Sequence, residues 1–475
     1  MSVKFGTGGW RAVIADGFTK ANVQLLAAAL AQKMKDEAAA ENGFVIGYDR
    51  RFLSREAAQW AAEVLAGAGI VCLLIDREAP TPLVMFSVKY YGLSYGMAVT
   101  ASHNPAVYNG IKVFTEGGRD ADETVTRDLE RRMELLEGRA TPAVPYAEGL
   151  RGGAIRLVDP MNPYLDSILR AVRTDAIRAR HLKIVLDPMY GVSRTALQTV
   201  LITARCDVDV IHERHDALFG GRLPAPNEKT LSQLQNYVLE HGCDIGIATD
   251  GDADRLGIID DQGAFLHPNK ILVLLYYYLL KYRGWHGPAV RNLATTHLLD
   301  AIARDFGETC FEVPVGFKHI SGKMAETDAV IGGESSGGLT VRGHIQGKDG
   351  IYAAALLVEM MAVTGRHLSD LYREITDRYG TFETEERDYS FTPEEKARIQ
   401  KMLLEDRLLP EFGTPAERVS YLDGCKVYFR GGGWIVGRFS GTEPLLRIFC
   451  EMDTLARAQA ATRTLERFLG LGAAL

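Results

Sequence analysis

Residues 44–75 read FVIGYDRRFLSREAAQWAAEVLAGAGIVCLLI, and this stretch decides the fold class. It opens with an apolar run at 44–48, continues through an alanine-rich stretch at 55–66, and closes with a second apolar run at 71–75. Two short β-branched runs on either side of an amphipathic helical stretch are typical of a β-α-β unit.

The same unit recurs twice. The second copy opens with a strand at 183–186, followed by a helix near 193–203 and a strand at 206–211, and the third has the corresponding elements at 289–293, 296–306 and 310–315. Each copy precedes another strand-like run that ends in a polar, glycine-containing loop, after Thr100, Thr249 and Ile331. Because ligands bind beyond the carboxyl ends of strands in α/β sheets, we expect these loops to face one cleft. One large sheet with accidental similarity is the alternative.

The length also predicts several domains, since single hydrophobic cores stop growing at roughly 250 to 300 residues and the chain has 475. The charged segment 383–396 is expected to be a linker. Two strands around a tight loop at 440–444, followed by a helix, predict a last domain of α+β type. The predicted domains are 1–150, 151–264, 265–382 and 383–475.

Composition excludes several classes of protein. Apolar residues make up 47 % and charged residues 24 %, which is ordinary for a globular protein. The net charge of −7 and the lack of Lys/Arg runs argue against a nucleic-acid partner. Six widely spaced cysteines without a C-x-x-C pair fit a reducing cytosol, and the longest apolar stretch, 271–280, is short of the ~20 residues of a membrane span. We expect a cytoplasmic protein with no membrane partner.

Residues 250–255 read DGDADR and place three carboxylates at alternate positions between two apolar runs. Such crowding is costly without a cation, and carboxylate oxygens are preferred ligands of hard ions such as Mg²⁺. An EF-hand would need glycine in place of Arg255 and glutamate in place of Asp261. The loop therefore predicts a magnesium site at Asp250, Asp252 and Asp254 rather than a solvated acidic turn.

Residues 100–105 read TASHNP at the end of another apolar run. Pro105 restricts the residue before it to an extended conformation, so Ser102 is expected to be held out of the sheet. Neighbouring Ser and His rarely form a nucleophile-base pair, and Ser/Asn/Pro clusters usually mark turns. Taken alone, the loop is weak evidence for a nucleophilic serine, and the interpretation depends on the other motifs.

Residues 333–337 read GESSG and match the G-x-S-x-G elbow of serine hydrolases, which is the main competing interpretation. His344 and His367 follow, but no HGGG-type oxyanion motif precedes the elbow, and a hydrolase leaves the three aspartates unexplained. We interpret Glu334 and Ser336 as polar groups for sugar hydroxyls, with a plain glycine-rich turn as the simpler alternative.

Residues 438–444 read RFSGTEP, with Arg447 beyond them. A planar cation, two hydroxyls and glycine-permitted backbone amides have the composition of a phosphate cradle. The sequence is neither a Walker A motif nor G-x-G-x-x-G, so nucleotide binding is not indicated. Taken in isolation, the segment could be an ordinary hairpin turn.

In this order the four loops resemble the α-D-phosphohexomutase superfamily, the phosphoglucomutases and phosphomannomutases, over the whole chain. That family has a T-A-S-H-N-P phosphoserine loop, a D-G-D-x-D-R metal loop, a G-E-x-S-G sugar loop and an R-x-S-G-T-E-P phosphate loop. The segments GTGGWR at 6–11 and NGIK at 109–112 also match family elements.

The resemblance implies an α/β fold with three similar mixed-sheet α/β domains and a smaller C-terminal α+β domain around a central cleft. It also implies a reaction in which phosphorylated Ser102 gives its phosphoryl group to a free hydroxyl of a hexose phosphate. The resulting hexose 1,6-bisphosphate turns over and returns its other phosphate to Ser102.

The resemblance further assigns residues to roles. The expected catalytic residues are Ser102, Lys112, Arg11, Arg255 and His103. Mg²⁺ is expected on Asp250, Asp252, Asp254 and an oxygen of phosphorylated Ser102. The expected substrate-binding residues are Glu334, Ser336, Lys318, Arg438, Ser440, Gly441, Thr442 and Arg447. Without the other loops, Arg11 and Lys112 would be interpreted as surface cations.

Two departures favour glucose as the sugar. Phosphomannomutase-type and phosphoglucosamine-type sugar loops commonly end in G-H, whereas this one ends in Gly337-Gly338. Residues 315–318, VGFK, resemble the G-[WF]-K element of phosphoglucomutases, with Lys318 as a second phosphate contact. Phosphomannomutase and phosphoglucosamine mutase are the alternatives, and a serine hydrolase or a non-catalytic sugar-phosphate-binding protein are remote ones. A monomer or homodimer is expected.

Overall fold

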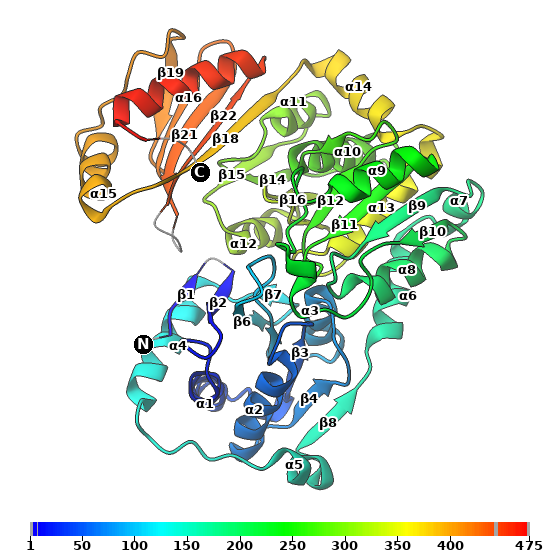
Figure 1. Ribbon diagram of the computed structural model, residues 1–475, viewed down its shortest axis with the longest axis vertical. Helices are drawn as coiled ribbons and strands as arrows, with labels where there is room; N and C mark the ends of the chain where they lie inside the picture. Colours follow the sequence, from blue (N-terminus) through cyan, green and yellow to red (C-terminus); the bar gives the residue numbers. More distant parts are fainter. Residues whose placement is uncertain (1–2, 7, 441–444, 473–475) are drawn as a thin grey trace. The chain divides into compact units, whose positions relative to one another are not determined.

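The computed structural model describes residues 3–6, 8–440 and 445–472 (Figure 1). Backbone contacts divide the chain into two units. Unit 1 comprises Met1–Ile271 and Ser336–Ser369, and unit 2 comprises Leu272–Ser335 and Asp370–Leu475.

The first sheet lies in unit 1 and has the strand order β1-β2-β6-β5-β3-β4-β8, with β7 paired to β6. Strands β5, β3, β4 and β8 run parallel, and β6 is antiparallel to β5. The strands are β1 (Phe5–Gly6), β2 (Gly9–Val13), β3 (Phe44–Tyr48), β4 (Cys72–Ile75), β5 (Tyr95–Val99), β6 (Tyr108–Thr115), β7 (Arg119–Asp120) and β8 (Ile155–Val158). The helices of this part are α1 (Lys20–Asp36), α2 (Ser54–Gly67), α3 (Thr81–Tyr90), α4 (Glu123–Leu136) and α5 (Tyr146–Gly152).

The second sheet, also in unit 1, has the order β10-β9-β11-β12-β13. Its strands are β9 (Lys183–Asp187), β10 (Asp207–Val210), β11 (Ile245–Thr249), β12 (Leu256–Ile259) and β13 (Phe265–Leu266), and its helices are α6 (Met161–Ala171), α7 (Thr174–Arg178), α8 (Ser193–Thr203) and α9 (Ser232–His241). Strand β17 (Leu339–Val341) and helix α13 (Gly350–Thr364) return to unit 1, where α13 packs on α7 and α8.

Unit 2 contains the parallel strands β15-β14-β16 and a separate antiparallel sheet of order β18-β22-β21-β20-β19. The strands are β14 (Ala289–Asn292), β15 (Cys310–Val313), β16 (Ile331–Gly333), β18 (Glu383–Ser390), β19 (Ala416–Ser420), β20 (Cys425–Phe429), β21 (Trp434–Phe439) and β22 (Leu445–Met452). The helices are α11 (Leu298–Asp305), α12 (Phe317–Thr327), α15 (Pro393–Gln400) and α16 (Leu455–Leu469), while α10 (Pro268–Lys281) and α14 (Leu368–Tyr379) cross the points of division.

The threefold repeat predicted from the sequence is confirmed. The units β3-α2-β4, β9-α8-β10 and β14-α11-β15 each pair two parallel strands, and a third parallel strand, β5, β11 or β16, adds to the other side of the first. Strands β3, β5 and β11 are buried along their whole length, as expected for strands covered on both faces. The predicted α/β class with a last α+β region is therefore confirmed.

The predicted linker at 383–396 is wrong. Its first part is strand β18, which pairs along eight residues with β22, and its second part begins helix α15. Two of the charges that suggested a linker are paired: Arg387 Nη1 donates to Glu466 Oε1 of α16 at 2.9 Å, and Arg387 Nε donates to Glu385 Oε1 at 2.7 Å. A strand with many charged residues can have the same composition as a linker, and only its pairing with β22 distinguishes the two.

The four-domain division stays a prediction. The first sheet includes β8, which lies beyond the predicted boundary at residue 150.

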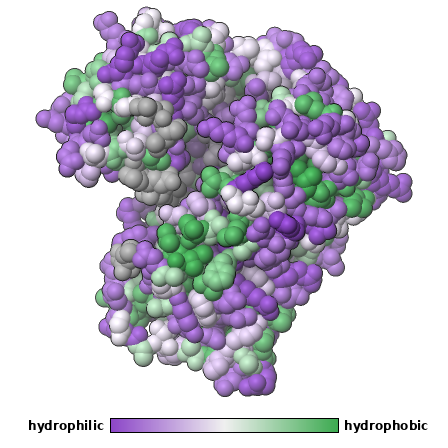
Figure 2. Space-filling view, viewed as in Figure 1, coloured by the Kyte–Doolittle hydropathy of each residue, from purple (hydrophilic) through white to green (hydrophobic). Residues whose placement is uncertain are grey.

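In the part of the chain that the structure describes, no single helix is long and apolar enough to cross a membrane. One bent pair of helices, Gly350–Thr364 with Leu368–Tyr379, has sufficient length and apolar composition only when the two are taken together. Figure 2 shows a face on which polar side chains predominate and apolar ones gather in smaller patches.

A buried lysine marks the packing within unit 2. Lys426 Nζ on β20 donates to Leu293 O at 2.6 Å and to Glu312 Oε2 at 2.7 Å, and it lies 4.2 Å from the centre of the Trp434 ring. Burial, and then the guanidinium of Arg291, lower the pKa of Lys426 to about 7 against the opposing effect of Glu312.

This lysine makes stability depend on pH. In the unfolded chain its pKa is about 10.4, so between pH 7 and pH 10 the unfolded state binds more protons and the free energy of unfolding rises with pH. We expect Lys426→Met to lower the slope of that free energy against pH by up to about 1.4 kcal/mol per pH unit. Urea denaturation of both proteins from pH 7 to 10 measures the slopes. The exposed Lys401→Met is the control, and equal slopes for wild type and Lys426→Met would contradict the prediction.

Candidate functional site

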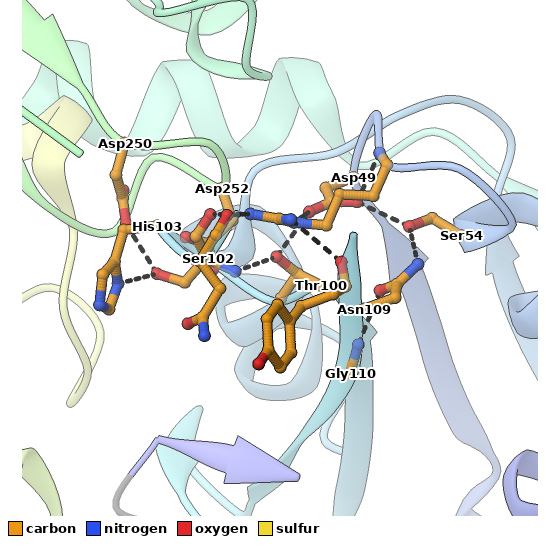
Figure 3. Close-up of polar contacts among 12 residues, drawn as sticks. Asp49, Ser54, Thr100, Ser102, His103, Asn109, Gly110, Asp250 and Asp252 are labelled. Carbon is orange, nitrogen blue, oxygen red and sulfur yellow. Dashed lines mark hydrogen bonds and ion pairs between the residues drawn. The ribbon is translucent and has the colours of Figure 1, made fainter. Parts of the chain in front are cut away.

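The serine loop begins where β5 ends and leads into β6. Ser102 is buried and has a left-handed backbone, with φ of 53°, which is uncommon for a residue other than glycine. Its amide donates to Thr100 Oγ1 at 2.8 Å, and its own Oγ donates to Asp250 Oδ2 at 2.7 Å (Figure 3). The serine is thus held out of the sheet, as the sequence predicts, with its hydroxyl directed at the aspartate loop.

The aspartate loop connects β11 to β12. Asp250, Asp252 and Asp254 are fully buried, and each offers an oxygen within 4.8 Å of the others. Ala253 between them has a left-handed φ of 63°, which lets the chain turn so that alternate carboxylates converge. The structure therefore brings together the serine and the three predicted metal ligands, all within unit 1.

Lysines balance this buried negative charge. Lys112 on β6 donates to Asp252 Oδ2 at 2.6 Å and to Asp254 Oδ2 at 2.5 Å, and Lys348 Nζ lies 2.8 Å from Asp254 Oδ2. The amide of Arg255 donates to Asp250 Oδ1 at 3.0 Å. Burial without partners would cost several kcal/mol for each charge, and these pairs offset part of that cost.

The residues present fit a divalent cation. Asp252 Oδ1 and Asp254 Oδ1 are buried and have no hydrogen-bond partner among the described residues. An unsatisfied buried carboxylate oxygen is costly in a protein interior, whereas three carboxylates without Cys or His suit a hard ion such as Mg²⁺. The oxygens that no protein donor satisfies are the ones a metal would take.

The electrostatics of the three carboxylates differ. Burial, and then the charges of Asp252 and Asp254, raise the pKa of Asp250 well above its usual range. Burial also acts to raise the pKa of Asp254, but Lys112 and then Lys348 hold that pKa well below its usual range. A cation bound here would favour the charged form of all three groups.

Two further predicted catalytic residues lie beside the serine. His103 Nδ1 is 3.3 Å from Ser102 Oγ, and burial, followed by the charge of Arg255, lowers the pKa of His103 well below its usual value. Arg11 on β2 donates from Nη1 to Asn104 Oδ1 at 2.5 Å. All five predicted catalytic side chains, including Arg255 with Nε 4.0 Å from Asp254 Oδ1, belong to unit 1.

The predicted sugar loop is divided between the two units. Glu334 follows β16 in unit 2, where its Oε1 accepts hydrogen bonds from Asn292 Nδ2 at 3.3 Å and Gly316 N at 3.2 Å. Lys318 stands in the first turn of α12 in the same unit, close in sequence to Gly316. Ser336 is an exposed residue of unit 1.

The predicted phosphate loop follows β21 in unit 2. Arg438 is buried at the end of that strand, its Nε donates to Asp423 Oδ2 at 3.2 Å, and it lies opposite Arg447 of β22. The amide of Ser440 donates to Leu445 O at 2.8 Å. Gly441 and Thr442 lie outside the described residues.

Sequence reasoning missed several side chains. Thr81 Oγ1 donates to Asp252 Oδ2 at 2.6 Å, and Lys348 pairs with Asp254. Asp423 Oδ2 accepts from Val315 N at 3.0 Å as well as from Arg438. Thr81 could have been noticed as the first residue of a Pro-flanked helix, whereas an Asp-Gly turn such as Asp423-Gly424 carries no special signal.

Comparisons with known proteins identify the family of the chain. Three family models match: phosphoglucomutase/phosphomannomutase α/β/α domain I at residues 2–139, domain II at 162–263 and domain III at 267–379. A phosphoglucomutase/phosphomannomutase of Thermococcus kodakarensis is 30 % identical over 460 residues, which are 97 % of this chain and 96 % of the relative. A probable phosphoglucosamine mutase of Methanothermobacter thermautotrophicus is 32 % identical over 417 residues, 87 % of each chain.

A solved structure shows the same fold. The protein of Thermus thermophilus assigned as a phosphomannomutase is 28 % identical, superposes with a TM-score of 0.86 and covers 99 % of both chains. The chain belongs to the phosphoglucomutase/phosphomannomutase family of the α-D-phosphohexomutase superfamily, whose members are hexose phosphate mutases.

Proposed function

We propose that this protein interconverts hexose 1-phosphate and hexose 6-phosphate, with glucose as the preferred sugar and Ser102 as the phosphoryl carrier. The observation that carries the proposal is the placement of Ser102 Oγ 2.7 Å from Asp250 Oδ2, beside two more buried carboxylates with unsatisfied oxygens. A nucleophilic oxygen beside a hard-metal site is the arrangement that phosphoryl transfer requires.

The reaction has two mirrored halves. In the first, the bond between Ser102 Oγ and phosphorus breaks, and a new bond forms between phosphorus and the free sugar oxygen. The sugar hydroxyl loses its proton and Ser102 Oγ gains one, so that hexose 1,6-bisphosphate and free serine result. In the second half the other phosphate of the turned bisphosphate returns to Ser102, and the proton moves back.

The chain's own residues supply charge and position. Lys112 and Arg255 place positive charge beside the transferring group, and His103 and Arg11 flank the serine loop. Mg²⁺ held by Asp250, Asp252 and Asp254 would neutralise negative charge on the phosphoryl oxygens. Arg438 and Ser440 would hold the phosphate that is not reacting, with Lys318 and Arg447 as further cations and Glu334 and Ser336 contacting sugar hydroxyls.

The preference for glucose rests partly on Gly338. A side chain at this position would collide with Lys348, whose Cδ lies 2.3 Å from where the Cβ would be. The histidine common in mannose-type and glucosamine-type loops therefore has no room while Lys348 pairs with Asp254. Assays with the 1-phosphates of glucose, mannose, glucosamine and N-acetylglucosamine test the preference, and a higher kcat/KM with any of the other three would overturn it.

Replacing the phosphoryl carrier should stop the reaction. We expect Ser102→Ala to remove nearly all mutase activity together with one labile phosphate visible in the intact mass. Ser335→Ala should keep a measurable fraction of activity, because Ser335 carries no phosphoryl group in the proposed reaction and would be the nucleophile only in a serine hydrolase. If Ser102→Ala kept its activity and Ser335→Ala lost it, the mutase mechanism would be wrong. Esterase activity in the wild type that Ser335→Ala abolishes would support a serine hydrolase.

Metal removal should be reversible. EDTA is expected to abolish turnover and Mg²⁺ to restore it, and restoration by Zn²⁺ alone would contradict the hard carboxylate site. Asp252→Asn, which removes one anionic ligand, should lower both the affinity for Mg²⁺ by calorimetry and kcat. Asp261→Asn, in the turn between β12 and β13, is the matched control and should behave as wild type.

The phosphate loop must hold one phosphate firmly yet release it when the bisphosphate turns. Arg438→Ala removes a charged donor worth about 1.5 to 3 kcal/mol, or roughly one to two decades in affinity. We expect a raised KM and release of hexose 1,6-bisphosphate into solution, with partial rescue by added bisphosphate. Wild-type kinetics without release would show that the loop is a structural turn, and the exposed Arg430→Ala is the control.

A further inference from the structure

One buried arginine holds the backbone of the whole serine loop. Arg51 Nη2 donates to Ser102 O at 2.7 Å and to Asn104 O at 2.6 Å, and Nη1 donates to Pro105 O at 2.9 Å and to Tyr108 O at 3.1 Å. The Arg51 side chain is completely buried. Three carbonyl oxygens of the connection between β5 and β6, and that of the first residue of β6, therefore converge on a single guanidinium.

The arginine is itself fixed by Asp49, the residue that follows β3. Asp49 Oδ2 lies 3.3 Å from Arg51 Nε and accepts from Thr100 Oγ1 at 2.6 Å, while Oδ1 accepts from Arg51 N at 2.9 Å and Ser54 Oγ at 2.7 Å. Thr100 Oγ1 in turn accepts from the amide of Ser102. Figure 3 shows this chain of contacts from Asp49 through Thr100 to Ser102. The amide of Ser102 is thus connected to Asp49 through Thr100, and its carbonyl is connected to Asp49 through Arg51.

We call the four hydrogen bonds from Arg51 to main-chain oxygens the Arg51 clamp. The reason for this clamp lies in the conformation of Ser102. A left-handed residue other than glycine costs of order 1 to 3 kcal/mol and persists only where surrounding contacts impose it. The ring of Phe219, whose centre is 4.8 Å from the Arg51 guanidinium carbon, adds a cation–π contact to the arginine. Loss of the clamp would let the Ser102 backbone relax and turn its Oγ away from Asp250.

We propose that Arg51 is the positioning residue for phosphoryl transfer, and that its grip on four main-chain carbonyls keeps Ser102 Oγ directed at the metal loop in both the free and the phosphorylated enzyme. The inference rests on the proposed function. The Arg51 side chain is completely buried and its two terminal nitrogens donate to main-chain oxygens, so it acts through the backbone of Ser102. It should therefore affect kcat and leave KM nearly unchanged.

The test compares Arg51→Lys, Arg51→Ala and the matched control Arg50→Ala. Lysine keeps the charge but cannot form the fork, and misplacement by about 1 Å can cost on the order of 100-fold in rate. We expect kcat of Arg51→Lys to fall roughly 10- to 100-fold with KM within about twofold of wild type. Phosphorylation of Ser102 by glucose 1,6-bisphosphate, followed by intact mass in a single turnover, should slow by the same factor.

Arg50 is a suitable control because it is the neighbouring arginine and also donates to loop carbonyls, but those of other loops. Its Nη1 contacts Tyr190 O at 3.3 Å and Glu213 O at 3.1 Å. Arg50→Ala should keep near wild-type kcat. Low concentrations of guanidinium should restore activity to Arg51→Ala, as the ion refills the vacated site, and should not restore it to Arg51→Lys.

Several outcomes would overturn the proposal. These are a wild-type kcat in Arg51→Lys, a raised KM with unchanged kcat, or a folded Arg51→Ala that guanidinium fails to restore. Hydrogen exchange of the peptide covering 101–108 is the readout that does not need mutase activity: faster exchange in Arg51→Lys than in wild type and Arg50→Ala supports the clamp, and equal exchange overturns it. A wild type that neither turns over hexose phosphate nor accepts phosphate on Ser102 would refute the proposed function, and the exchange result would still judge the clamp.

Discussion

A single ammonium group shared by two buried carboxylates is the interaction on which the rest of the site depends. Lys112 belongs to the first sheet, and Asp252 and Asp254 belong to the loop of the second. Removing one partner of a buried ion pair typically costs about 3 to 5 kcal/mol, because the other charge is left uncompensated. This contact holds β6 against the aspartate loop, and together with the hydrogen bonds of Arg51 it keeps Ser102 beside Asp250.

The repeated topology explains why chemistry collects in loops of one kind. In each repeat the third parallel strand, β5, β11 or β16, ends in a polar segment: the serine loop, the aspartate loop and the loop of Glu334. Carboxyl ends of parallel strands are where α/β proteins place ligands. Repetition of one strand order has supplied three such loops, and each carries a different set of polar side chains.

Much of the fold could be predicted because its signal is local. The β-α-β repeats are visible as apolar runs of the right length and spacing, and the three aspartates crowd within five residues. The strand β18 could not be predicted, because its charges look solvated until Glu466 on α16 is known to face Arg387. Arg51 and Asp423 were missed for a related reason, since Arg51 binds main-chain carbonyls and Asp423 binds a main-chain amide, all distant in sequence. Every residue type except proline offers the same backbone donor and acceptor, so a hydrogen bond to a backbone atom leaves no pattern in the sequence of the backbone partner.

That property of Arg51 has an evolutionary consequence. Its four acceptors are main-chain oxygens, which every amino acid provides, so the geometry of the loop does not depend on the identity of most side chains within it. Val107, a large apolar residue that is 58 % exposed in this loop, illustrates the freedom. The outer surface of the serine loop can therefore change between relatives while Ser102 Oγ stays directed at Asp250.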